Sequence, residues 1–112
     1  MSYCIAPDRK RMVRSVYRPM IRVVIIEDQA LLANVLDAWL ARQPGCKPAG
    51  VAADGASGWD LCMEMRPDAV LVDIGLPDID GLELARRLMV RLPTLRVLVM
   101  SGHEDVETLR RV

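Results

Sequence analysis

The chain has 112 residues, of which 52% are apolar and 27% charged, and its formal net charge is zero. This length suits one domain, and so high an apolar fraction excludes a disordered chain. The longest aliphatic run, Val23 to Ile26, is far shorter than the roughly 20 residues of a membrane-spanning helix. The three cysteines lack the paired spacing of a disulfide framework or a zinc site, so we expect Cys46 and Cys62 to fill apolar space.

Basic residues are concentrated at the start of the chain. Residues 1–20 carry five of them against Asp8 alone, whereas residues 21–112 carry ten basic and fourteen acidic residues. We therefore expect residues 1–20 to be a basic, flexible extension. No apolar stretch follows these charges, so a secretory signal is not predicted and we expect a cytoplasmic protein. Met20 directly precedes the first strand pattern, and two interpretations stay open: translation begins at Met1 or at Met20.

From residue 21 onward, short apolar runs alternate with helical patterns. The predicted strands span residues 22–26, 49–53, 69–72 and 97–100. Apolar residues recur at helical spacing after each strand, over residues 31–40, 59–65, 82–89 and 104–112. We expect the first three helices to end at Gln43 to Gly45, at Pro67 and at Pro93, respectively.

This alternation predicts an α/β fold. The strands are apolar on both faces, which is typical of a parallel sheet covered by helices. Right-handed crossovers then favour a doubly wound parallel sheet. Ligands of such folds bind at the carboxyl ends of the strands, so the residues at those ends are the candidate site.

Polar side chains stand at three of the four predicted strand ends. Glu27 and Asp28 follow the first strand, Asp73 the third and Ser101 the fourth. Crowded carboxylates repel one another unless a cation neutralises them. Oxygen ligands of this kind suit Mg²⁺, which keeps several waters and also accepts phosphate oxygens. Gly75 is a small residue beside this edge and allows close approach of backbone and ligand.

Each of these residues also has a purely structural interpretation. An aspartate after a strand is commonly a helix cap, and Asp28 could cap the helix that follows it. Three such positions at one edge are harder to explain as separate caps. No catalytic role is expected for His103, and Asp78 to Gly81 lacks the spacing of an EF-hand. We expect Arg86, Arg87 and Arg91 to form a solvated helix face.

At this point the residues resemble a known family, the receiver domain of bacterial two-component response regulators. The resemblance covers residues 21–112 and is strongest to the branch with helix-turn-helix DNA-binding output domains. Its most specific part is an Asp-x-x-x-Pro-x-x-Asp-Gly pattern. The matching segments are Ile25 to Asp28, Val70 to Pro77, Asp80-Gly81 and Val97 to Gly102.

The resemblance implies a role for each site residue. Asp73 would accept a phosphoryl group from the phosphohistidine of a sensor histidine kinase. Glu27, Asp28 and Asp73, with the backbone carbonyl of Gly75, would hold Mg²⁺. Ser101 would bind a phosphoryl oxygen and shift when it arrives, switching the domain to control a DNA-binding output. Such a receiver is not an enzyme beyond assisting its own phosphorylation and dephosphorylation.

The sequence departs from the family pattern in what it lacks. Family receivers have the flavodoxin-like order 2-1-3-4-5, with a phosphoryl-binding lysine and a switch aromatic near the fifth strand. Here the only lysines are Lys10 and Lys47. We therefore expect residues 21–112 to form an incomplete receiver domain without the fifth strand and fifth helix. Glu27 in place of the commoner aspartate is a mild change.

The missing fifth strand and fifth helix affect which partners we expect, and an alternative function stays open. We expect self-association, because the fourth strand becomes an exposed edge. No membrane contact is expected, and DNA contact only through an output domain outside this chain. The alternative function is a non-phosphorylated, receiver-like interaction or dimerisation module. An aspartyl-nucleophile phosphatase is disfavoured, because Gly75 stands where such enzymes carry a second acid.

Overall fold

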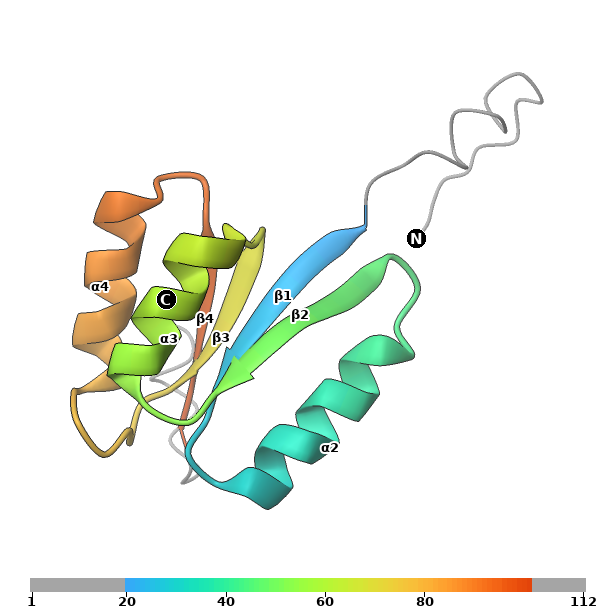
Figure 1. Ribbon diagram of the computed structural model, residues 1–112, viewed down its shortest axis with the longest axis horizontal. Helices are drawn as coiled ribbons and strands as arrows, with labels where there is room; N and C mark the ends of the chain where they lie inside the picture. The colour runs from blue at the N-terminus through green and yellow to red at the C-terminus, as the bar shows by residue number, and fades with distance from the viewer. Residues whose placement is uncertain (1–19, 102–112) are drawn as a thin grey trace.

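The computed structural model describes residues 20–101, in which strands and helices alternate (Figure 1). The order is β1 (Ile21–Ile26), α2 (Ala30–Ala41), β2 (Cys46–Ala52), α3 (Gly55–Met65), β3 (Ala69–Asp73), α4 (Gly81–Arg91) and β4 (Arg96–Met100). The predicted elements within this range are all present. Residues 1–19 of the predicted basic extension lie outside the described residues, as do Gly102, His103 and the helix predicted over residues 104–112.

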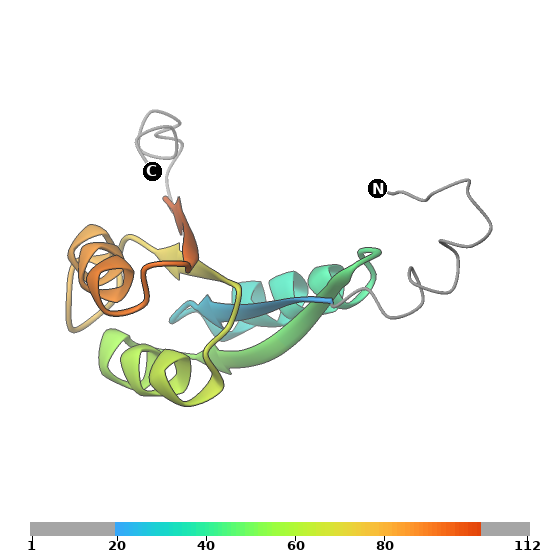
Figure 2. The ribbon, with the colours of Figure 1, turned by 90° about the horizontal axis from the view of Figure 1, so that it is seen from above.

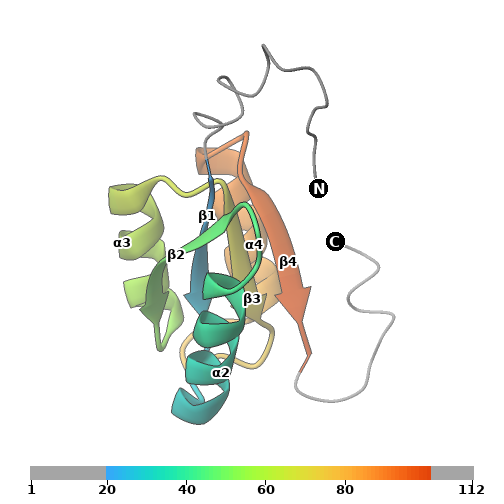
Figure 3. The ribbon, with the colours of Figure 1, turned by 90° about the vertical axis from the view of Figure 1, so that its right-hand side faces the viewer.

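The four strands form one parallel sheet in the order β2-β1-β3-β4. This confirms the doubly wound α/β fold and the expected order 2-1-3-4 of the flavodoxin-like arrangement. Helices α3 and α4 cover one face and α2 the other (Figures 2 and 3). In Figure 3 the arrowheads of β1 and β4 point toward the same end of the sheet, where the site residues follow the strands.

Alternate residues of the strands enter two separate cores. Val24 and Ile26 of β1, with Val70 and Val72 of β3, pack beneath α3 and α4. Their neighbours Val23, Ile25 and Leu71 face the smaller cluster under α2. Burial on both faces explains why β1 reads as an uninterrupted apolar run.

The second strand was predicted too short, at residues 49–53; the structure begins it at Cys46. Pro48 and Gly50 weaken the sequence pattern of a strand. Both are tolerated because β2 is an edge strand of the described sheet and its pairing shifts register beside them, between Val23 and Val24 of β1. The two cysteines that were predicted to fill apolar space do so: Cys62 is buried and Cys46 is half-buried.

Helix α2 differs from the predicted amphipathic pattern. Its apolar stripe includes Leu31, Val35 and Trp39, yet Leu31 is 78% exposed and Trp39 55% exposed. Leu36 and Leu40 make the contacts with the sheet, and α2 packs on β1 and β2. The opposite apolar stripe therefore faces outward, as does Leu98 of β4, which is 55% exposed on the same side of the sheet.

Among residues 20–101, no helix combines the length and apolar character needed to cross a membrane.

Candidate functional site

Three carboxylates meet at the carboxyl ends of β1 and β3, as the sequence predicts. Glu27 and Asp28 follow β1, and Asp73 ends β3, its neighbour in the sheet. One carboxylate oxygen from each of the three lies within 4.8 Å of the others. Glu27 is 3% exposed and Asp73 7% exposed, whereas Asp28 is exposed to solvent. The strand register produces this meeting, since Ile26 pairs with Val72 and the next residue of each strand is acidic.

The surroundings of Glu27 shift the pKa of its carboxyl group. Burial raises the pKa of the Glu27 carboxyl to about 7. A hydrogen bond from the backbone N–H of Gln29 to Oε2, 3.0 Å long, opposes this rise, and the Asp73 carboxylate adds to it. A group of this kind gives up its proton readily when a cation arrives beside it.

Asp28 is not a helix cap, which settles the alternative left open by the sequence. The N-cap position of α2 is Gln29, and no side-chain capping bond is made there. The Asp28 carboxylate lies at the exposed side of the cluster.

Gly75 lies beside the Asp73 carboxylate, and Ser101 follows β4, the strand that pairs with β3. The backbone N–H of Gly75 donates to Oδ1 of Asp73 at 3.2 Å. Ser101 directly follows Met100, which pairs with Asp73 in the sheet and accepts a hydrogen bond from Ile74 N–H at 2.8 Å. A side chain at Gly75 would meet nothing within 4 Å, so the described residues leave open space at this position.

The loop after Asp73 is closed by a glycine that the fold requires. The N–H of Gly81 donates to the carbonyl of Ile74 at 3.0 Å, and Asp80 caps α4 by accepting from Leu82 N–H at 2.9 Å. A Cβ at position 81 would lie 2.3 Å from the carbonyl oxygen of Asp73. The Asp-Gly pair of the family pattern thus has a local physical reason: a cap followed by a close backbone crossing.

Asp78 makes a contact with helix α3 that the sequence did not predict. Its carboxylate accepts hydrogen bonds from the first turn of α3, whose residues are more than twenty positions away. No local spacing signals a contact of this kind. Asp78 and Asp80 both accept hydrogen bonds from backbone N–H groups at helix starts.

The remaining candidates stay outside the cluster. Arg86 and Arg87 are exposed and pair with Glu83, as expected of a solvated helix face. Burial raises the pKa of the Cys62 thiol to about 11, so this cysteine is an inert core residue. Lys47 is at the amino end of β2, the opposite end of the sheet from Asp73.

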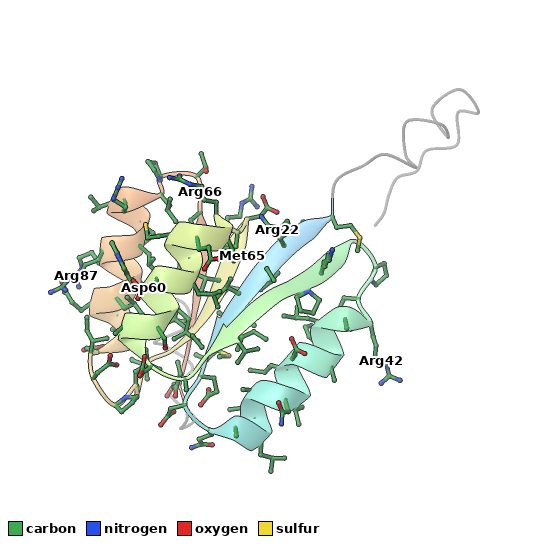
Figure 4. All side chains as sticks on the ribbon, viewed as in Figure 1. Arg22, Arg42, Asp60, Met65, Arg66 and Arg87 are labelled. Atoms are coloured by element: carbon green, nitrogen blue, oxygen red, sulfur yellow. The ribbon has the colours of Figure 1, made fainter. Side chains whose placement is uncertain are left out.

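A surface cleft of about 440 Å³ opens between α3 and α4, away from the carboxylates. In Figure 4, Asp60 of α3 and Arg87 of α4 mark its two sides, while Arg42 lies at the far end of α2. Its other lining residues are Gly55, Ala56, Trp59, Asp78, Ile79 and Leu84.

The donor set at the strand ends fits a hard divalent cation. It consists of carboxylate oxygens with an open side at Asp28, and no sulfur or imidazole ligand is part of it. Mg²⁺ prefers such oxygens and binds through a few carboxylates while keeping waters and phosphate oxygens. Burial is the main cause of the raised pKa of Glu27, and a cation would relieve the smaller contribution that comes from the Asp73 carboxylate.

Comparison with known proteins agrees with this fold. The response regulator receiver domain family matches residues 23–112. A protein-glutamate methylesterase/protein-glutamine glutaminase from Koribacter versatilis is 37% identical over 83 residues, 74% of this chain and 23% of its own length. The transcriptional regulatory protein DegU of Brevibacillus brevis is 35% identical over 85 residues, 76% of this chain and 36% of its own length. The chain thus spans well under half of these relatives.

A solved structure gives the same result. The response regulator domain of Thermotoga maritima CheB superposes with a TM-score of 0.71 at 33% identity, covering 81% of this chain and 72% of that one. This chain belongs to the response regulator receiver domain family. Domains of this family are the phosphoacceptor modules of two-component signalling.

The charge state of Glu27 yields a pH prediction. A carboxyl group whose pKa is raised on folding stabilises the fold while protonated, and this contribution is lost as the pH rises. With a chelator present, we expect the free energy of unfolding to fall by about 3 kcal/mol between the ordinary pKa of 4.5 and about 7. Denaturant titrations across this pH range measure it, and Glu27→Gln should flatten this part of the profile. An unchanged profile in that variant would rule out Glu27 as the titrating group.

Proposed function

We propose that Asp73 is the phosphoacceptor of this receiver domain and that the phosphohistidine of a sensor histidine kinase is its donor. The observation that carries the proposal is the cluster of Glu27, Asp28 and Asp73 within 4.8 Å at the ends of two adjacent parallel strands. Asp73 ends an inner strand of the described sheet and is followed by a loop fixed at Gly75 and Gly81. Glu27 and Asp28 directly follow the neighbouring strand β1, where they can hold a cation between themselves and Asp73.

The proposed cofactor is Mg²⁺, held by the carboxylates of Glu27, Asp28 and Asp73 and by the backbone carbonyl of Gly75. When bound, it supplies positive charge that neutralises the carboxylates and the incoming phosphoryl oxygens. The chain's own contribution is to place the nucleophile. The Gly75 N–H holds Oδ1 of Asp73, and the strand and its crossing at Gly81 fix the backbone.

The transfer itself is an exchange of one bond for another. A carboxylate oxygen of Asp73 attacks phosphorus, and a P–O bond forms while the P–N bond of the donor breaks. The electron pair of the broken bond stays on the imidazole nitrogen of the kinase, which takes up a proton. The product is an acyl phosphate on Asp73.

The phosphoryl group would act as a switch through Ser101. Phosphorylation adds roughly −1.5 to −2 charge and new acceptor oxygens beside residues that are already acidic. A hydroxyl one residue beyond the strand paired with Asp73 is well placed to donate to such an oxygen. Contacts that differ between the two states can then shift the conformational equilibrium.

The proposed output is control of transcription through a DNA-binding domain beyond this chain, in a cytoplasmic protein without membrane contact. The similarity to DegU, a transcriptional regulatory protein, supports this proposal. A second candidate output is suggested by the methylesterase relative. In this alternative, the receiver domain of this chain would regulate an attached enzyme.

The second partner that we propose is another copy of this chain. Leu98 on β4 and the outward stripe of α2, with Leu31 and Trp39, leave apolar surface on one side of the sheet. A second copy can cover such a surface. Pairing of this kind could also serve the alternative function, a receiver-like interaction module that is never phosphorylated.

Beryllofluoride, which mimics a phosphoryl group on a carboxylate, separates the two functions. For a phosphoacceptor we expect Mg²⁺-dependent binding of beryllofluoride at one site per chain, measured by calorimetry. The interaction module instead predicts no binding, together with concentration-dependent self-association by light scattering. Absence of beryllofluoride binding at saturating Mg²⁺ would contradict the proposed phosphoacceptor.

A further inference from the structure

The loop between β3 and α4 is attached to helix α3 through one side chain. Oδ1 of Asp78 accepts a hydrogen bond from Gly55 N–H at 2.7 Å, and Oδ2 accepts one from Ala56 N–H at 2.9 Å. Figure 1 shows this loop passing the first turn of α3 before α4 begins. The first N–H groups of a helix have no partner within the helix, so an outside carboxylate satisfies them well.

Helix α3 already has a cap of its own. The Asp54 side chain accepts from Ser57 N–H at 2.8 Å, as an N-cap residue does. Asp54 thus holds the helix start locally, while Asp78 binds the two preceding N–H groups from a distant loop. Two carboxylates share one helix end, and only Asp78 connects it to the loop that follows Asp73.

The contact is close as well as polar. A Cβ on Gly55 would lie 2.2 Å from Cγ2 of Ile79 and 3.1 Å from Oδ1 of Asp78. The absence of a side chain at Gly55 therefore allows the loop to rest on the helix. The two backbone hydrogen bonds also lower the pKa of the Asp78 carboxyl, which keeps it ionised at neutral pH.

The same loop begins at the carboxylate cluster. Gly75 donates to Oδ1 of Asp73, and the N–H of Ile74 bonds to β4 through the carbonyl of Met100. The carbonyl of Gly75, which is the proposed backbone ligand, lies three residues before Asp78. Movement of the loop at Asp78 would therefore displace this ligand relative to Asp73.

We propose that Asp78 is a positioning residue, which fixes the acceptor loop against the first turn of α3 and thereby couples that helix to the phosphoacceptor site. This inference rests on the proposed function of Asp73. Loss of the contact frees the loop between Gly75 and Asp80, so the geometry at Gly75 is no longer held. A motion of α3 is in turn transmitted to the loop through the same two hydrogen bonds.

The test compares Asp78→Ala with Asp54→Ala in the full chain. Each variant removes one carboxylate from the same helix end, so each weakens the start of α3, but of the two only Asp78 belongs to the loop. Calorimetry with Mg²⁺ alone should show affinity reduced roughly threefold or more for Asp78→Ala, and unchanged affinity for Asp54→Ala. Asp78→Asn, which keeps one acceptor oxygen, should fall between the parent and Asp78→Ala.

Amide hydrogen exchange provides the second readout. We expect faster exchange at Gly75 and Gly81 in Asp78→Ala but not in Asp54→Ala. Equal Mg²⁺ affinity and equal loop exchange in the two variants would overturn the positioning role and leave Asp78 a simple cap. If the parent binds no Mg²⁺, the proposed site fails, whereas loop exchange still decides whether Asp78 holds the loop.

Discussion

Replacing Asp73 with asparagine should abolish phosphoryl transfer to this chain while leaving it folded. The asparagine has nearly the same shape, and its Oδ1 can still accept the hydrogen bond from Gly75 N–H. It lacks the anionic oxygen that attacks phosphorus, so no acyl phosphate can form. Intact-protein mass spectrometry after incubation with a small phosphodonor and Mg²⁺ measures the result.

Two variants control for indirect effects of this substitution. Asp28→Asn keeps the nucleophile but removes an exposed carboxylate of the cluster, so labelling should become slower and Mg²⁺ binding weaker. Asp60→Asn, on the exposed surface of α3, should be labelled like the parent. Labelling of Asp73→Asn at the parental rate would show that the acceptor is elsewhere.

Gly81→Ala is expected to be the most destabilising of the single-methyl substitutions in the acceptor loop. The added Cβ would lie 2.3 Å from the Asp73 carbonyl oxygen and 2.6 Å from Cα of Ile74, and both are backbone atoms that cannot rotate away. Forcing this crossing apart should lower the free energy of unfolding by about 3 kcal/mol. Thermal unfolding should show a Tm lower by about 13 °C.

Gly75→Ala is the matched control six residues earlier in the chain. A Cβ there meets no atom within 4 Å, and the residue has no positive φ. We expect its free energy of unfolding to stay within about 0.5 kcal/mol of the parent value. Similar melting of the two alanine variants would mean that the crossing at Gly81 is not the constraint described above.

The carboxylate cluster could be predicted from the sequence because it depends on strand ends alone. Parallel strands place their carboxyl ends at one edge, so acidic residues directly after two apolar runs must lie close together. Glu27 and Asp73 follow such runs, and β1 and β3 are neighbours in the sheet. The sequence did not decide whether Asp28 caps α2; that required the backbone of Gln29.

Contacts between distant segments could not be predicted in this way. Asp78 binds Gly55 through loop geometry that leaves no periodic signal in the sequence. Which apolar residues of α2 face outward also needed the structure, because Leu31 and Trp39 have the spacing of a buried face. Two apolar faces on one helix give the same period, and only packing decides which of them meets the sheet.

The central claim is that Asp73 carries the phosphoryl group, and locating that group on the chain tests it most directly. Reduction of the phosphorylated protein with borohydride converts an aspartyl phosphate to homoserine, and peptide mass spectrometry then identifies the position. We predict homoserine at residue 73 alone, and only in samples that received both phosphodonor and Mg²⁺. Homoserine at residue 28 or at any other aspartate, with residue 73 unmodified, would contradict the assignment.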